Sequence, residues 1–150
     1  MTEKIKTVAN YIAKRYEPML GLFHGVRCEN DFILFKKYLP NCAIVGTSDT
    51  IESEANNILL RNCALFYRDF VARFDFIFSY VYMDVFLPDE TIYIWKNQIA
   101  ENGIILLDVA KDFYLIEIES IKIIDNAIKI IDVLDFRNSK TIVIEVVNNA

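Results

Sequence analysis

The sequence predicts one α/β domain over residues 1–150, with a mostly parallel central sheet that ends in antiparallel strands. Short apolar runs alternate with amphipathic segments of about a dozen residues, which is typical of right-handed βαβ units. The run over residues 42–46 is apolar without alternation, as expected for a parallel strand buried on both faces. After residue 109 the pattern changes to Ile- and Val-rich runs divided by short polar turns, which indicates added antiparallel strands.

The expected elements up to residue 109 begin and end at proline, glycine or acidic residues. We first expect a helix over residues 2–16 ending before Pro18, a strand over 19–24 closed by Gly25, a helix from Asn30-Asp31 to Pro40 and a strand over 42–46. A third helix follows, with the buried face Ile51, Ala55, Ile58 and Leu59, and then strands over 63–67 and 74–82. The last elements of this part are a helix that begins at Pro88, has Ile92, Trp95 and Ile99 facing inward and is capped by Asn102-Gly103, and a strand over 104–109.

The C-terminal tail contains three further apolar runs, over residues 113–124, 127–136 and 141–147. Asp125-Asn126 and Arg137-Asn138-Ser139 separate them and are typical of hairpin turns. We therefore expect three more strands at one edge of the sheet, with a short helix over residues 112–120 as the alternative for the first run.

Composition and charge narrow the class of protein. The chain is 54% hydrophobic and carries a net charge of −5, which argues against disorder and against sequence-independent binding of nucleic acid. No apolar run is long enough to span a bilayer and no apolar signal core is recognised, so a cytoplasmic protein is expected. Cys28, Cys42 and Cys63 have only His24 to join them, so we expect reduced thiols and no metal site.

Two segments resemble the class I S-adenosylmethionine-dependent methyltransferase superfamily. They are Phe74-Asp75-Phe76-Ile77-Phe78-Ser79 and Ile99-Ala100-Glu101-Asn102-Gly103-Ile104-Ile105-Leu106-Leu107, preceded by a helix, a strand with a glycine turn, a helix and a strand with an acidic turn. The resemblance covers roughly residues 5 to 109, and it implies a Rossmann-like three-layer sandwich that binds S-adenosylmethionine. Within the superfamily, residues 8–16 are similar to the N-terminal helix of a small uncharacterised archaeal group.

The first cofactor loop of this superfamily reads acid-x-Gly-x-Gly, and the matching stretch here is Phe23-His24-Gly25-Val26-Arg27. One glycine is kept, while Phe23 replaces the acid and Arg27 replaces the second glycine. Arg27 either binds an anionic ligand at the start of the following helix or is a charged loop residue that faces solvent. His24 is either a general base or, as we weigh it, a structural residue at the end of a strand.

The resemblance assigns cofactor binding to Gly25, Asp49 and Asp69. Asp49 would contact the ribose hydroxyls, although it equally fits the cap of the third helix, because Glu52 follows three residues later. Asp69 would contact the adenine amine, with a surface acid as the alternative. The catalytic residues are unknown, and Tyr80, Tyr82 and Asp84 are the candidates to face the methyl acceptor.

Three functional hypotheses remain. The first is an S-adenosylmethionine-binding, methyltransferase-like protein of unknown acceptor. Amine-methylating relatives carry an Asn/Asp-Pro-Pro-aromatic string, and this chain has Ser79-Tyr80-Val81-Tyr82 instead, which disfavours an amine methylase. The second is a non-catalytic module, either a partner subunit or a ligand sensor, whose apolar surface is buried in an oligomer or against another protein. The third is another nucleotide-binding Rossmann protein, which the lack of Gly-x-Gly-x-x-Gly and of Gly-Lys-Ser/Thr argues against.

Overall fold

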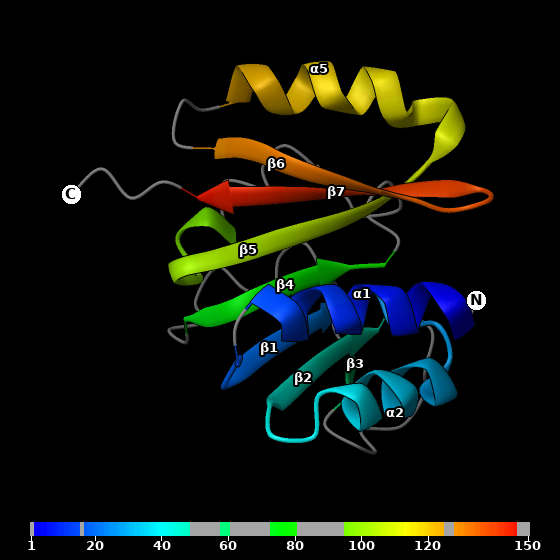
Figure 1. Cartoon of the computed structure of the whole chain (residues 1–150), viewed down its shortest axis with the longest axis vertical. Coiled ribbons are helices and arrows are strands. Elements are labelled where there is room, and N and C mark those ends of the chain that lie inside the picture. Colours follow the sequence, from blue (N-terminus) through cyan, green and yellow to red (C-terminus); the bar gives the residue numbers. More distant parts are fainter. Residues whose placement is uncertain are drawn as a thin grey trace.

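The computed structural model describes residues 2–15, 17–48, 58–60, 73–80, 95–124 and 128–146. Within these ranges the elements are, in order, α1 (Thr2–Arg15), β1 (Leu20–His24), α2 (Glu29–Tyr38), β2 (Ala43–Ser48), β3 (Ile58–Leu60), β4 (Phe74–Ser79), β5 (Ile99–Ala110), a 3-10 turn η4 (Lys111–Phe113), α5 (Tyr114–Ile124), β6 (Ile128–Asp135) and β7 (Ser139–Val146) (Figure 1). Among the described residues, no helix has the length and apolar character needed to cross a membrane.

The described strands form one seven-stranded sheet in the order β3-β2-β1-β4-β5-β7-β6. The pairs from β3 through β5 are all parallel, and β7 is antiparallel to both β5 and β6. This confirms the predicted α/β class, the parallel centre and the antiparallel C-terminal strands. The strand order reverses at β1, because β2 pairs with one of its edges and β4 with the other.

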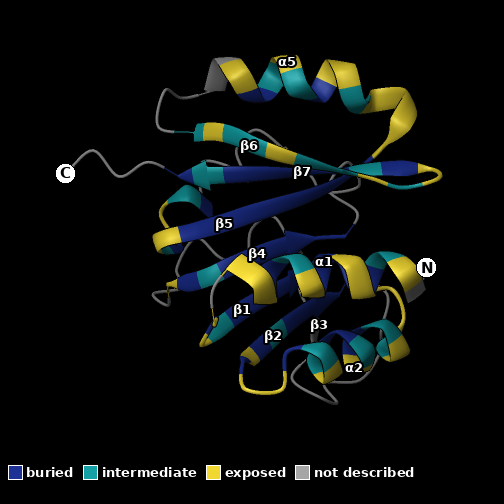
Figure 2. Cartoon of the chain, viewed as in Figure 1, coloured by how far each residue is buried: buried dark blue, intermediate teal, exposed yellow. Residues whose placement is uncertain are grey.

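Two separate hydrophobic clusters cover the two faces of the sheet, so the architecture has three layers. The central strands between them are buried along most of their length (Figure 2). On one face, alternate residues of β1 and β4 such as Phe23 and Phe78 pack against α1 and α2. On the other face, Leu22 and Ile77 pack with Trp95 and with Ile121 of α5. Burial on both faces explains why these strands read as continuous apolar runs in the sequence.

The third strand lies earlier in the chain than predicted. Ile58 and Leu59, which we expected on the buried face of a third helix, belong to β3 and pair with Gly46 and Thr47 of β2. The periodicity of a short apolar run does not distinguish a strand from the buried side of a helix. Here the pairing with β2 determines that the segment is a strand. The rest of that helix and the strand expected over residues 63–67 lie outside the described residues.

The start of β5 also differs from the prediction. Trp95 is helical and buried, but Ile99 pairs with Phe74 in the sheet instead of facing inward from a helix. Asn102 has the positive φ of 64° that an Asn-Gly pair favours, yet it interrupts a strand rather than capping a helix. The pairing with β4 shifts register between Phe74 and Phe76, so the extra residues form a bulge.

The tail combines one wrong prediction with one that is confirmed. The strand expected over residues 113–124 is wrong, because η4 and α5 occupy this segment as the alternative anticipated. Ile121 is buried while Leu115 and Ile116 are 75% and 65% exposed, so the run has the two sides of a surface helix. The predicted hairpin at residues 137–139 is present, and Phe136 N donates a hydrogen bond to Ser139 O at 2.9 Å. The turn expected at Asp125-Asn126 lies outside the described residues.

Candidate functional site

The turn that follows β1 is fastened to the end of β2 at the carboxyl edge of the parallel strands. Gly25 has a φ of 83°, a backbone conformation that residues other than glycine rarely adopt. The amides of Gly25 and Val26 both donate to Thr47 O, at 3.0 and 2.8 Å, and the Ser48 hydroxyl donates to Val26 O. The retained glycine of the loop therefore makes a tight connection between the two strands at the place where their carboxyl ends meet.

His24 is enclosed beside this turn. Its side chain is fully buried, its Nδ1 lies 2.9 Å from Ser79 Oγ of β4, and its ring meets the Trp95 ring edge-on at 4.8 Å between centroids. Burial lowers the pKa of His24 from 6.5 to about 3, so the imidazole is neutral at physiological pH. Within the described residues Nε2 has no hydrogen-bond partner. This geometry supports the structural interpretation of His24 and offers a substrate no access to the ring.

Phe23, which replaces the acid of the cofactor loop, is the centre of an aromatic cluster. Its ring lies 5.1 Å from the rings of both Phe35 and Phe78 and is stacked on Tyr80 at 5.9 Å. The side chain is 1% exposed. The position therefore contributes to the hydrophobic core beneath α2, and it offers no polar group to a ligand.

Tyr80 is the one acceptor-side candidate that falls in a described segment. Its backbone amide donates to His24 O at 3.0 Å, which places it beside the glycine turn, and its ring belongs to the same core cluster as Phe23. Burial, together with the charges of Asp31 and Asp108, raises the pKa of Tyr80 to about 12, although the charge of Arg27 opposes the rise. The phenol is therefore protonated at physiological pH and can act as a hydrogen-bond donor.

The other predicted site residues are Asp49, Asp69, Tyr82 and Asp84, and all four lie outside the described residues. Asp49 follows Ser48 directly, so it continues the chain from the end of β2. The structure thus brings Gly25 and Tyr80 to one edge of the sheet, and the roles of the remaining four stay predictions. Cys28 is an exposed free thiol and Cys42 a buried one, whereas Cys63 is also outside the described residues.

An ion pair that sequence reasoning missed lies near Tyr80. Lys4 Nζ of α1 is 3.1 Å from Asp108 Oδ2 of β5, and the two side chains are 16% and 8% exposed. The same ammonium lies 5.4 Å from the centroid of the Tyr80 ring and 5.6 Å from that of Phe136. The sequence contained one signal for this ion pair, which is the position of Asp108 inside the apolar run over residues 104–109. A charge buried in such a run needs a partner.

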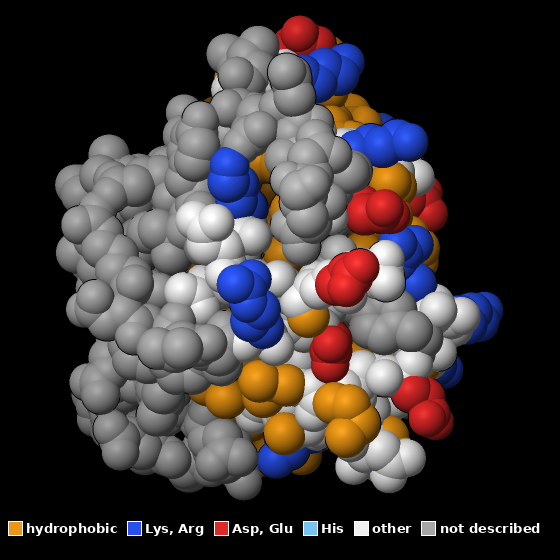
Figure 3. Space-filling model, turned by 90° about the vertical axis from the view of Figure 1, so that its left-hand side faces the viewer, with side chains coloured by type: hydrophobic (Ala, Val, Ile, Leu, Met, Phe, Trp, Pro, Cys, Tyr) orange, Lys and Arg blue, Asp and Glu red, His pale blue; other side chains and the backbone are white. Residues whose placement is uncertain are grey.

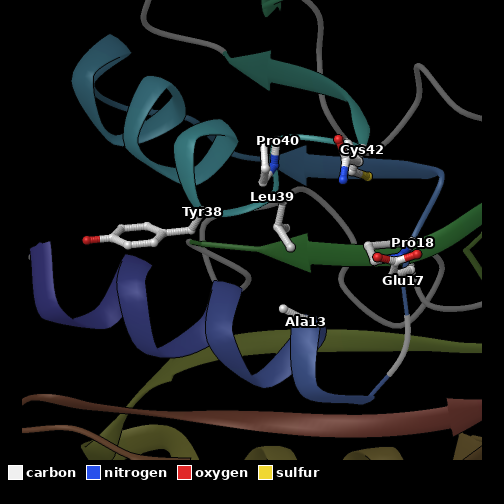
Figure 4. A pocket seen from close by; sticks show the side chains of 8 residues that line it. Ala13, Glu17, Pro18, Tyr38, Leu39, Pro40 and Cys42 are labelled. Atoms are coloured by element: carbon white, nitrogen blue, oxygen red, sulfur yellow. The ribbon is translucent and has the colours of Figure 1, made fainter.

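Two of the cavities that described residues line lie at opposite edges of the sheet. One, of about 230 Å³, adjoins the start of α1 and the turn between β6 and β7, on the carboxyl side, and is lined by Glu3, Lys4, Phe136, Arg137 and Asn138. The other, of about 140 Å³, lies between the ends of α1 and α2 and is lined by Ala13, Glu17, Pro18, Tyr38, Leu39, Pro40, Asn41 and Cys42 (Figure 4). The edge that carries this second cavity shows hydrophobic side chains gathered below a mixture of acidic and basic ones (Figure 3). Ligands of doubly wound sheets bind at the carboxyl ends of the strands, so the second cavity is on the wrong side for a cofactor.

Many solved methyltransferases share this fold. The ribosomal protein L11 methylase from Lactobacillus delbrueckii subsp. bulgaricus aligns with a TM-score of 0.72 at 14% identity, over 98% of this chain and 79% of that one. The N-methyltransferase NodS from Bradyrhizobium japonicum WM9 gives 0.69 at 12% identity, over 97% and 96%. The precorrin-6y C5,15-methyltransferase from Geobacter metallireducens GS-15 gives 0.68 at 14%, over 97% and 88%.

These matches show that the chain has the class I methyltransferase-type Rossmann-like fold along nearly its whole length. Identities this low establish the fold alone. No protein-family model matches the chain, and neither does any curated protein. NodS and the Podospora anserina methyltransferase PaMTH1 were both solved with S-adenosyl-L-homocysteine bound. The narrower resemblance to an archaeal group finds no support in these matches.

Proposed function

We propose that this protein binds S-adenosylmethionine over the carboxyl ends of β1, β2 and β4 and acts as a methyltransferase-like protein. The observation that carries this proposal is the Gly25 turn, with its φ of 83°, at the strand where the sheet order reverses. Open α/β sheets bind ligands in the crevice outside such a reversal point. Two proteins of the same fold hold the demethylated product of this cofactor, which agrees with the proposal.

In this proposal the cofactor is held by few polar groups. Gly25 lets a ligand approach the backbone, but its amide and that of Val26 already donate to Thr47 O, so they are engaged within the protein. Asp49 and Asp69 would then supply the contacts to ribose and adenine. S-adenosylmethionine brings an already electrophilic methyl group, and the contribution of the chain is to align an acceptor and exclude water. Tyr80, Tyr82 and Asp84 are the groups proposed to face that acceptor.

A second candidate is a non-catalytic module that serves as a partner subunit or ligand sensor. The burial of Phe23 at the position of the loop acid favours it, because one cofactor contact of the fold has been replaced by core packing. Apolar side chains at the surface of η4 and α5 are available for a partner or a second copy of the chain, with Phe113 49% exposed beside Leu115 and Ile116.

Titration calorimetry with S-adenosylmethionine and S-adenosyl-L-homocysteine tests the proposal. We expect saturable binding in the micromolar range that is lost in Asp49→Ala and kept in Asp112→Ala, a control at an exposed acid. The absence of heat up to millimolar ligand would eliminate cofactor binding. Light scattering tests the second candidate, since a strictly monomeric species that co-purifies with no other protein would count heavily against a subunit role.

A further inference from the structure

The ammonium of Lys4 lies in a site built from four separate segments of the chain. We call Tyr80, Asp108 and Phe136 the ammonium cage. Asp108 Oδ2 accepts a hydrogen bond from Lys4 Nζ at 3.1 Å, and the two aromatic rings have their centroids 5.4 and 5.6 Å from the same nitrogen. These residues come from the end of β4, from β5 and from the β6–β7 turn, while Lys4 comes from α1.

A carboxylate combined with two aromatic faces is the arrangement by which proteins recognise ammonium groups. Ring quadrupoles attract a cation within about 6 Å of their centroids, and they do so without hydrogen bonds, so methylated ammonium groups are accepted. The cage is largely desolvated, because Asp108 is 8% and Tyr80 4% exposed. The two aromatic rings and the low exposure of the cage strengthen its attraction for an ammonium group beyond that of an exposed ion pair.

Lys4 is not the only neighbour of the Asp108 carboxylate. Burial raises the pKa of this carboxyl group, while the charge of Lys4 and side-chain hydrogen bonds with Ser139, Lys4 and Thr141 oppose that rise. Residues other than Lys4 therefore also hold the carboxylate in position. The cavity of about 230 Å³ at this edge is lined in part by Lys4 and Phe136, so it adjoins the cage.

We propose that the ammonium cage is a binding site for alkylammonium head groups, and that Lys4 fills it in the ligand-free chain as an internal substitute. A ligand would enter through the adjoining cavity and displace the Lys4 side chain from Asp108. Nothing in this proposal requires S-adenosylmethionine. Tyr80 also contacts the glycine turn through its backbone, so the site adjoins the proposed cofactor edge.

The test removes Lys4 and supplies a small cation in its place. The melting temperature of Lys4→Ala is measured in tetramethylammonium chloride and in sodium chloride of equal ionic strength. We expect tetramethylammonium to raise Tm by about 2–4 °C over sodium chloride, because a ligand that binds only the folded state stabilises it. The wild type and Lys6→Ala, which removes an exposed lysine of the same helix, should show a smaller rise, because tetramethylammonium must first displace Lys4 from the cage.

Two controls separate cage binding from general effects. The double variant K4A/D108N keeps the vacated space but loses the carboxylate, so it should gain nothing from tetramethylammonium. tert-Butanol, which has a similar shape and no charge, should not raise the Tm of K4A. If K4A is unfolded in sodium chloride, refolding yield in the two salts replaces Tm as the measurement.

The proposal is overturned if tetramethylammonium stabilises or refolds K4A no more than K4A/D108N, if tert-butanol acts equally well, or if the wild type gains no stability at any tetramethylammonium concentration. Lys4 would then be a structural ion-pair residue that fastens α1 to β5. No cofactor is present in this experiment, so its outcome is independent of the calorimetry with S-adenosylmethionine. Either result can stand while the other fails.

Discussion

Acidification should destabilise the folded chain through His24. The folded pKa of His24 is lowered from 6.5 to about 3 because the ring is buried. Between these two values the unfolded chain binds a proton that the folded chain excludes, so stability falls as the pH falls. The contribution of a neutral His24 is fully present above pH 6.5 and is lost progressively down to about pH 3.

The size of the effect follows from linkage. Each unit of pH between the two pKa values changes the free energy of unfolding by about 1.4 kcal/mol. Acidification from about pH 7.5 to about pH 5 should therefore remove about 2 kcal/mol of stability through this one group. Burial also raises the pKa values of Asp31 and Asp108, and these carboxyl groups act in the opposite direction because the folded chain binds their protons more readily.

A variant without a titrating ring isolates the His24 contribution. His24→Gln keeps a polar group that can reach Ser79 Oγ, and it retains every carboxyl group of the wild type. Urea unfolding of both proteins at the two pH values gives four free energies. The stability difference between wild type and variant should shift by about 2 kcal/mol in favour of the variant on acidification, whatever the substitution costs at neutral pH.

A difference between the two proteins that does not change with pH would refute the reasoning. It would mean that His24 reaches solvent or gains a proton without cost in the folded state, and the structural interpretation of this residue would be wrong. A nuclear magnetic resonance titration of the single histidine checks the same point directly. Its signals should not titrate above about pH 5 while the chain remains folded.

Three further predictions concern the backbone and the thiols. Gly21→Ala would place a Cβ in steric overlap with the Phe76 ring, so it should cost about 1–3 kcal/mol in urea unfolding, and the cost should be smaller in a Phe76→Leu background. Iodoacetamide at neutral pH should alkylate exposed Cys28 and spare Cys42, whose pKa burial raises to about 11; peptide mass mapping that finds Cys42 modified as fast as Cys28 would contradict this. Asn102→Ala should cost about 1 kcal/mol and Asn102→Gly nothing, because φ is 64° there; equal unfolding midpoints for the two variants would exclude that explanation.

Most element boundaries in the first third of the chain were predictable because single residues set them. Pro18 follows α1, Gly25 follows β1, and α2 ends before Pro40. Boundaries that depend on pairing were not predictable in this way. Ile58 and Leu59 have the same apolar side chains in a helix as in a strand, and the edge of β2 determines their conformation. Asn102-Gly103 supplies the same positive φ to a helix cap and to a bulge, and the register with β4 decides between them.

The candidate site was predictable to the extent that it depends on topology. Gly25 and Tyr80 follow two apolar runs, and the carboxyl ends of parallel strands lie at one edge, so their proximity could be inferred from the strand pattern alone. The contact between Lys4 and Asp108 could not, because 104 residues separate them and only the placement of α1 over β4 and β5 brings them together. Local sequence contains no information about that placement.

Phe23 determines how a cofactor could bind at all. A carboxylate at this position would lie among the rings of Phe35, Phe78 and Tyr80, and burying a charge there costs several kcal/mol unless a cation pairs with it. The aromatic cluster and the loop acid of the methyltransferases therefore exclude each other in this chain. S-adenosylmethionine bound at the proposed site would therefore be held without that acid. Binding to the wild-type chain is consequently the measurement that separates a rearranged cofactor site from one that has been lost, and Asp49→Ala then tests whether that carboxylate contributes.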